Sequence, residues 1–218
     1  MYPILYHMAA AESWPSIRKH GLLSTTSLLD LFQVSGQERI ALEEHHRPES
    51  VTIRHKKIGW AVVRDQKPMS DEGLMRCLQD GLTPRAWYQL LNRRVFFWLT
   101  RRRLERMMDA RAYKNIRKTV LVFDTRSLLA RHEHAVLLSP MNSGATKPMP
   151  FPRGRSTFLP LATYPFTERQ KLRKEPIVEL TVEDGVYNID KLIIRAEEVG
   201  AGKRPRVLVG SGRSQFDR

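Results

Sequence analysis

The sequence predicts a single α+β domain in which mixed β-strands carry short helices around them. Short apolar strands and short helices are interspersed irregularly over most of the chain, and strands dominate near its end. A doubly wound parallel sheet would instead show regular alternation of strands and helices. The 218 residues can bury a sizeable core, and the 41% hydrophobic content is that of a globular chain. We therefore expect one domain over residues 1–199 and a basic C-terminal tail over residues 200–218.

Local signals define the elements of the first half of the chain. Residues 5–8 are expected to form a strand, and Ser13 to cap a helix with Pro15 in its first turn, where a missing N–H costs nothing. Gly21 is the expected left-handed end of that helix. Thr83 and Pro84 have the same cap-and-proline pattern. Further helices are expected at 28–32, within 37–50 and around 74–78, and strands at 51–54 and 61–64.

The second half contains more strands. Residues 95–98 are expected to form an aromatic strand, and a helix follows from Thr100 to about Arg117, because its apolar residues recur at helical spacing. Residues 139–165 are rich in Pro, Gly, Ser and Asn, which is typical of a long functional or mobile loop. The remaining strands are expected at 120–124, 135–138, 177–182, 192–197 and 207–209.

The charge balance favours an anionic partner. The chain has 37 Lys and Arg against 23 Asp and Glu, a formal net charge of +14. A basic surface attracts polyanions, so nucleic acid, an anionic cofactor and acidic membrane surfaces are candidates. A generically basic protein would have the same balance. Among these partners we expect nucleic acid.

Other sites and locations find no support in the sequence. The single cysteine, Cys77, excludes an internal disulfide and a multi-cysteine metal site, and His132-Glu133-His134 lacks the helical spacing of a zinc site, so no metal is expected. The glycine-rich loops of nucleotide hydrolases and dinucleotide-binding oxidoreductases are missing. No apolar run approaches the ~20 residues of a membrane span, and the N-terminus does not read as a signal peptide. We therefore expect a cytoplasmic protein without membrane contact.

Three segments occur in a familiar order. The first comprises residues 5–8 (Leu-Tyr-His-Met), residues 14–17 (Trp-Pro-Ser-Ile) and Gly21-Leu22. The second is 94–98 (Arg-Val-Phe-Phe-Trp), and the third is 176–182 (Pro-Ile-Val-Glu-Leu-Thr-Val), with 189–194 after it. Together these segments, about a third of the chain, resemble ADP-ribosyltransferase-fold proteins, especially the DarT-type DNA ADP-ribosyltransferases. The nearest relatives are expected to form a bacterial family of unassigned function.

The resemblance implies a split, sandwiched sheet core and a reaction in which NAD is the substrate. The nicotinamide–ribose bond would break through an oxocarbenium-like state, which a carboxylate can stabilise. Glu179 matches the catalytic glutamate of the family, and His7 matches the histidine that binds the ribose of the adenosine half. Without the resemblance, Glu179 would be interpreted as a surface glutamate and His7 as a core histidine bonded to backbone.

Other side chains are candidates for binding NAD. Phe97 or a neighbouring aromatic residue could stack on nicotinamide, although a core strand has the same composition. Ser24, Thr25 and Thr26 could bond ribose or amide, or could equally cap the next helix. Guanidinium groups match phosphate oxygens in pairs, so the pyrophosphate could contact an arginine. The candidates for that contact are Arg54, Arg64 and Arg94.

In the related enzymes, the loop before the catalytic strand recognises the acceptor. On this basis Asn142 would read a base edge, while Arg153 and Arg155 would contact phosphate. The alternative is an ordinary ordered loop that covers the sheet.

The expected function is NAD-dependent ADP-ribosyl transfer to nucleic acid, either DNA or RNA. One alternative is NAD-dependent removal of an RNA 2′-phosphate, an activity that occurs on a related fold. The other is a non-catalytic nucleic-acid-binding module that inherited the fold, since a fold alone does not establish an activity.

Overall fold

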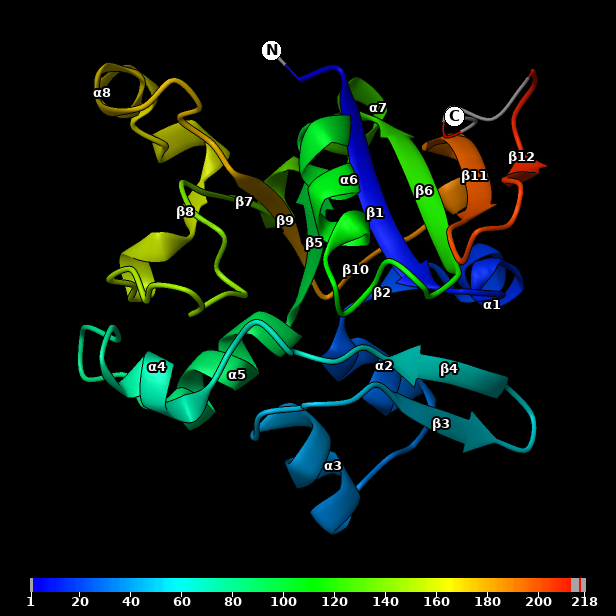
Figure 1. The fold of residues 1–218 in the computed structure, drawn as a ribbon, viewed down its shortest axis with the longest axis horizontal. Coiled ribbons are helices and arrows are strands. Elements are labelled where there is room, and N and C mark those ends of the chain that lie inside the picture. Colours follow the sequence, from blue (N-terminus) through cyan, green and yellow to red (C-terminus); the bar gives the residue numbers. More distant parts are fainter. Residues whose placement is uncertain (1, 213–215, 217–218) are drawn as a thin grey trace.

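A large antiparallel sheet forms the centre of the computed structural model, which describes residues 2–212 and residue 216 (Figure 1). Its strands are β1 (Ile4–Ala10), β5 (Arg94–Trp98), β6 (Lys118–Asp124), β7 (Val136–Ser139), β8 (Leu159–Pro160), β9 (Glu179–Glu183), β11 (Ile193–Val199) and β12 (Arg206–Val209). In the described part of the chain they form one eight-stranded sheet in the order β12-β11-β6-β1-β5-β9-β7-β8. Every pair is antiparallel.

Two small sheets and short helices surround the main sheet, which confirms the predicted α+β domain. One small sheet pairs β2 (Leu22–Leu23) with β10 (Gly185–Val186), and the other pairs β3 (Val51–His55) with β4 (Gly59–Val63). The helices are α1 (Trp14–His20), α2 (Thr25–Leu31), α3 (Gly36–Glu43), α4 (Asp71–Met75), α5 (Pro84–Asn92), α6 (Arg101–Asp109), α7 (Thr125–His132) and α8 (Phe166–Leu172). Figure 1 shows α2, α3, β3 and β4 grouped below the main sheet.

Two of the three predicted helix caps form, and one predicted helix is shorter than expected. Thr83 accepts a hydrogen bond from the backbone N–H of Ala86 at the start of α5. Gly21 ends α1 at φ 92°, but Ser13 makes no side-chain cap bond. The helix expected up to about residue 117 ends at Asp109, after which Ala110 adopts extended geometry.

The chain beyond α6 turns because a buried lysine binds its carbonyl groups. Nζ of Lys118 donates to the carbonyl oxygens of Tyr113 and Ile116. The hydroxyl of Tyr113 donates to Asp65, in the segment that follows β4. Residues 110–116 form hydrogen-bonded turns instead of a continuous helix. The bond between Tyr113 and Asp65 spans 48 positions and has no local pattern, so apolar spacing alone overestimated the length of the helix.

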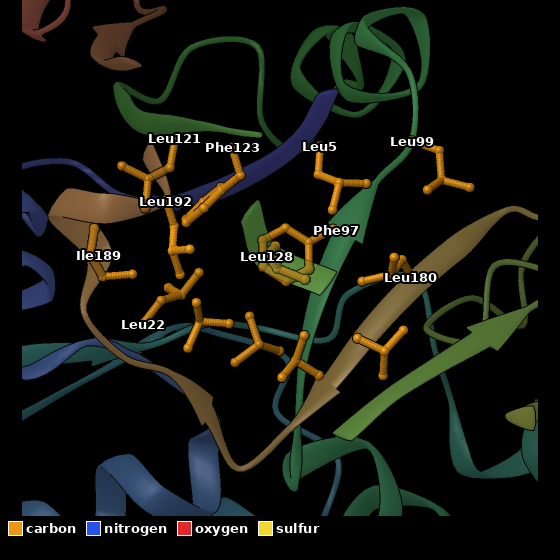
Figure 2. Close-up of a cluster of buried hydrophobic side chains, with 14 of the residues drawn as sticks. Leu5, Leu22, Phe97, Leu99, Leu121, Phe123, Leu128, Leu180, Ile189 and Leu192 are labelled. Carbon is orange, nitrogen blue, oxygen red and sulfur yellow. The ribbon is translucent and has the colours of Figure 1, made fainter. Parts of the chain in front are cut away.

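Alternating side chains of β1 supply two separate cores. Leu5 and Ala9 face one side, with Phe97, Phe123 and other residues of the cluster in Figure 2. Tyr6 and Met8 face the other side, where Leu104 of α6 packs against them. The group formed by α2, α3, β3 and β4 has its own small core. The main sheet therefore carries two covered faces, and the group below it is a partly independent unit.

The C-terminal segment contributes to the sheet. The edge strand expected at 207–209 is observed as β12, which pairs with β11. Phe216 packs with the core on the α6 side of the sheet. Among the described residues, no helix combines the length and apolarity needed to cross a bilayer.

The sheet opens between β1 and β5. β1 pairs with β6 along its whole length, but it shares only the pair Tyr6↔Trp98 with β5. β5 itself pairs continuously with β9. The two halves of the sheet therefore separate just beyond Tyr6, and His7 is the next residue.

Candidate active site

A cleft of about 890 Å³ extends from the point where β1 and β5 separate. It is lined by parts of β1, α1, β4, β5 and α6, by the loop over residues 141–151, and by the start of β9. Its volume lies within the usual range of small-molecule sites, which is roughly 300–1,000 Å³. Both His7 and Glu179 line it, so the structure brings together two residues that are far apart in the sequence.

His7 is fixed through one ring nitrogen and open at the other. Nδ1 lies 2.9 Å from the carbonyl oxygen of Phe96, so it carries the proton and donates it to that oxygen. Nε2 makes no hydrogen bond to any described residue. Burial, helped by the charge of Arg64, lowers the pKa of His7 to about 4, although the bond to Phe96 acts in the opposite direction. At neutral pH, Nε2 is therefore a free acceptor for a hydroxyl group in the cleft.

One carboxylate oxygen of Glu179 is hydrogen-bonded, and the other has no partner among the described residues. Its Oε2 accepts hydrogen bonds from the backbone N–H of Ser143 at 3.1 Å and from its hydroxyl at 2.7 Å. Oε1 has no hydrogen-bond partner among the described residues. Burial raises the pKa of this carboxyl to about 7, while the bonds from Ser143 and the charges of Arg153 and Arg103 lower it. Both protonation states are therefore populated near neutrality.

The strand register places Glu179 level with Tyr6, the residue before His7. Tyr6 is paired with Trp98, and Trp98 is paired with Glu179. With strands ~4.8 Å apart, the Cα atoms of Tyr6 and Glu179 are roughly 10 Å apart. Val178 and Leu180 are buried on either side of Glu179 in the sequence. The strand thus directs its carboxylate away from the apolar core, as the alternation predicted.

Of the predicted hydroxyl contacts, only Thr25 lines the cleft. Ser24 is buried and caps α2 by accepting a hydrogen bond from the backbone N–H of Ser27. Thr26 donates to Glu43. Helix capping, the alternative interpretation, is therefore what the structure shows for Ser24.

Phe97 lies outside the cleft. Its side chain is 1% exposed within the core of Figure 2, where its ring meets the His7 ring edge-on at 5.9 Å between centroids. Its neighbours Phe96 and Trp98 line the cleft instead. Successive strand residues face opposite sides, so the core takes Phe97 and the opening takes its neighbours.

The three arginines predicted to contact the pyrophosphate differ in their position relative to the cleft. Arg54 is exposed on β3 and does not line the cleft. Arg94 lines it, but its guanidinium is bonded to Glu183 at 3.0 Å and lies 4.8 Å from the centre of the Phe158 ring. Arg64 lines the cleft and donates to the carbonyl oxygen of Met8 at 3.0 Å. Arg64 is thus the best placed of the three for a phosphate.

Of the three residues predicted to contact the acceptor, only one lines the cleft. Asn142 lines the cleft, and its Oδ1 accepts from the backbone N–H of Gly144. Arg155 is exposed outside the cleft. Arg153 is 1% exposed, and its guanidinium nitrogens donate to three backbone carbonyls, so it has no free donor fork for a phosphate. The structure therefore does not place Arg153 for the predicted phosphate contact, because the loop itself uses its donors.

Trp60 and Ser143 are among the residues of the site that were not predicted. Trp60 lines the cleft from β4, where the alternating Ala61 and Val63 are buried in the small core below. This alternation was visible in the sequence. Ser143 left no such signal, since its bond to Glu179 spans 36 positions of the chain. No cluster of three or more potential metal-ligating side chains occurs within the described residues.

Comparison with known proteins gives a family but no activity. The chain matches the model of a family of unknown function, DUF7002, over residues 3–193. No curated protein matches it. Since the matched residues cover most of the chain, the protein belongs to the DUF7002 family of unknown function.

Proposed function

We propose that this protein is an NAD-dependent ADP-ribosyltransferase. The observation that carries the proposal is that Nε2 of His7 and Oε1 of Glu179, both without partners among the described residues, belong to residues lining one cleft where the sheet opens. The resemblance of the three sequence segments assigns ribose binding to the first residue and catalysis to the second. The cleft is also large enough for a ligand of dinucleotide size.

The proposed reaction replaces nicotinamide at C1′ of its ribose. The C1′–nitrogen bond breaks, and its electron pair leaves with nicotinamide. Positive charge develops on the ribose, and the carboxylate of Glu179 stabilises it. A lone pair of the acceptor then forms the new bond to C1′, and the acceptor's proton passes to the carboxylate or to water. His7 accepts a hydrogen bond from the ribose of the adenosine half.

Nucleic acid is the proposed acceptor class. Besides the net charge of +14, basic side chains line the same cleft as Glu179. Arg106, Lys147 and Arg173 are among them, and each can contact a phosphate. Asn142 lies on the same loop as Lys147 and offers an amide for contact with a base.

The test combines nicotinamide release with mass spectrometry of the products. The purified protein is incubated with NAD and with DNA, RNA or protein, and each polymer is searched for an added ADP-ribose. Glu179→Gln is expected to lose nicotinamide release and to retain NAD binding, whereas the exposed Glu168→Gln serves as the matched control. Unchanged release by Glu179→Gln would remove this carboxylate from the mechanism.

The same experiment separates the alternative functions. Salt-sensitive binding of DNA or RNA without NAD binding would replace the proposal with a non-catalytic nucleic-acid-binding module. Loss of a 2′-phosphate from RNA, in the presence of NAD, would identify an RNA 2′-phosphotransferase.

A further inference from the structure

Arg153 is a cationic side chain enclosed in the protein, close to the cleft but without access to it. It is among the largest side chains that are fully buried. Burying a guanidinium is costly unless its N–H groups are satisfied. Nε donates to the carbonyl oxygen of Phe151 at 3.0 Å, Nη1 to that of Ser143 at 2.9 Å, and Nη2 to that of Ala145 at 2.8 Å. One side chain therefore gathers three points of the loop over residues 139–154.

The backbone of Arg153 is itself anchored away from the loop. Its N–H donates to the carbonyl oxygen of Cys77 at 2.9 Å, and its own carbonyl accepts from the N–H of Gln79 at 2.9 Å. The guanidinium also lies 5.9 Å from the centre of the Trp87 ring, on α5. The loop is thus tied to the segment after α4 through Arg153.

Ser143 connects this anchor to Glu179. Its carbonyl oxygen accepts from Arg153, while its N–H and hydroxyl donate to Oε2 of Glu179. Ser143 is fully buried, so its position is set by these contacts and not by solvent. Holding Oε2 on the loop leaves Oε1 without a hydrogen-bond partner among the described residues, in a side chain that lines the cleft.

We propose that Arg153 is a positioning residue for the reaction, because it holds Ser143 where its two donors orient the carboxylate of Glu179. Arg153 acts through the loop and does not touch the substrate. The role in the reaction rests on the proposed function, but the effect of Arg153 on the carboxyl group can be measured without NAD.

Among the described residues, one other charged group lowers the pKa of this carboxyl besides Arg153. It is Arg103 of α6, which is itself paired with Glu175. Both guanidinium groups favour the ionised form, as do the two bonds from Ser143. Removing the Arg153 anchor therefore weakens both the charge and the hydrogen bonds that support the carboxylate.

The first measurement is a carbon NMR titration of the Glu179 carboxyl, with its resonance assigned by its loss in Glu179→Gln. Arg153→Met and Ser143→Ala are each expected to raise the titration midpoint by about one pH unit, since each removes support of the size of a charged hydrogen bond. Arg155→Met, a change of the exposed neighbouring arginine, is expected to leave the midpoint unchanged. An unchanged midpoint in Arg153→Met would overturn the inference, whatever Ser143→Ala shows, because the Ser143 hydroxyl bonds Glu179 directly.

Two further variants separate the possible causes. Arg153→Lys keeps the charge, but an ammonium group on a flexible stem does not reproduce the planar fork that meets three carbonyls, so its midpoint is also expected to rise. A midpoint equal to that of the wild type would mean that charge alone acts, which contradicts positioning through the loop. In all of these variants the loop keeps its attachment through Thr146, whose N–H donates to the carbonyl oxygen of Pro68. If Arg153→Met fails to fold, the midpoint of Arg153→Lys decides.

The second measurement is the rate of nicotinamide release. Arg153→Met is expected to lower kcat about tenfold or more, with the KM for NAD within about twofold, because the ribose contact of His7 is untouched. Unchanged kcat, or a rise in KM without a fall in kcat, would refute the role in positioning. Should the wild type release no nicotinamide, the proposed function fails, and the titration alone decides whether Arg153 orients the carboxyl.

Discussion

The carboxyl group of Glu179 is expected to destabilise the folded protein at neutral and alkaline pH. Burial raises its pKa from 4.5 to about 7, so the folded protein binds this proton more tightly than the unfolded chain does. Well below pH 4.5 the carboxyl group is protonated in both the folded and the unfolded state, and it does not destabilise the folded protein. As the pH rises from 4.5 to about 7, the unfolded chain releases the proton first and the free energy of unfolding falls.

The size of the effect follows from this difference in pKa. At 1.36 kcal/mol per pH unit, the cost reaches about 3 kcal/mol at pH 8, but only about 1 kcal/mol at pH 5. Glutamine has the same shape, and its carbonyl oxygen can accept both hydrogen bonds from Ser143. Glu179→Gln therefore removes the buried charge and should stabilise the protein by about these amounts.

The assay is urea-induced unfolding of the wild type and Glu179→Gln at pH 5 and pH 8, followed by circular dichroism. The difference between the two proteins isolates Glu179, because His7 and the other titrating groups are common to both. A difference that is the same at both pH values, or a less stable variant at pH 8, would refute the reasoning. Glu179 would then be a well-solvated or net stabilising carboxylate.

Three further predictions concern the cleft and the core behind it. The steady-state rate of nicotinamide release is expected to rise about tenfold from pH 6 to pH 8. The reason is that the ionised fraction of a carboxyl with a pKa of about 7 rises from about one tenth to about nine tenths. A rate that stays constant over this range would show that Glu179 does not act as a carboxylate. His7→Ala is expected to weaken NAD binding about tenfold, as for one lost hydrogen bond, whereas the exposed His45→Ala should bind normally in titration calorimetry. Phe97→Ala is expected to lower the free energy of unfolding by about 3–5 kcal/mol, since its ring fills the core. Normal stability with weakened NAD binding would instead make Phe97 a cofactor contact.

Local patterns were enough for most of the elements. A hydroxyl cap before proline predicted the start of α5, and Gly21 predicted the end of α1, because these signals depend on backbone geometry within a few residues. The helix α7 was not predicted, although Asp124 caps it by accepting from the backbone N–H of Ser127 at 2.6 Å. The length of α6 was overestimated, because the turns after it are held by the bond between Tyr113 and Asp65, which lie 48 positions apart.

For the candidate site, the sequence by itself determined which chemical groups are available and on which strands they lie. His7 follows from the first strand and Glu179 from a late strand with buried neighbours. Only the tertiary structure decided that β1 and β5 separate beside His7, that Phe97 faces the core, and that Arg153 holds a loop. Alternation tells which side chains of a strand share a face, but the partners packed against that face decide whether it is core or cleft. A hydrogen bond across many residues has no local pattern, and for this reason Ser143 and Arg153 emerged only from the folded chain.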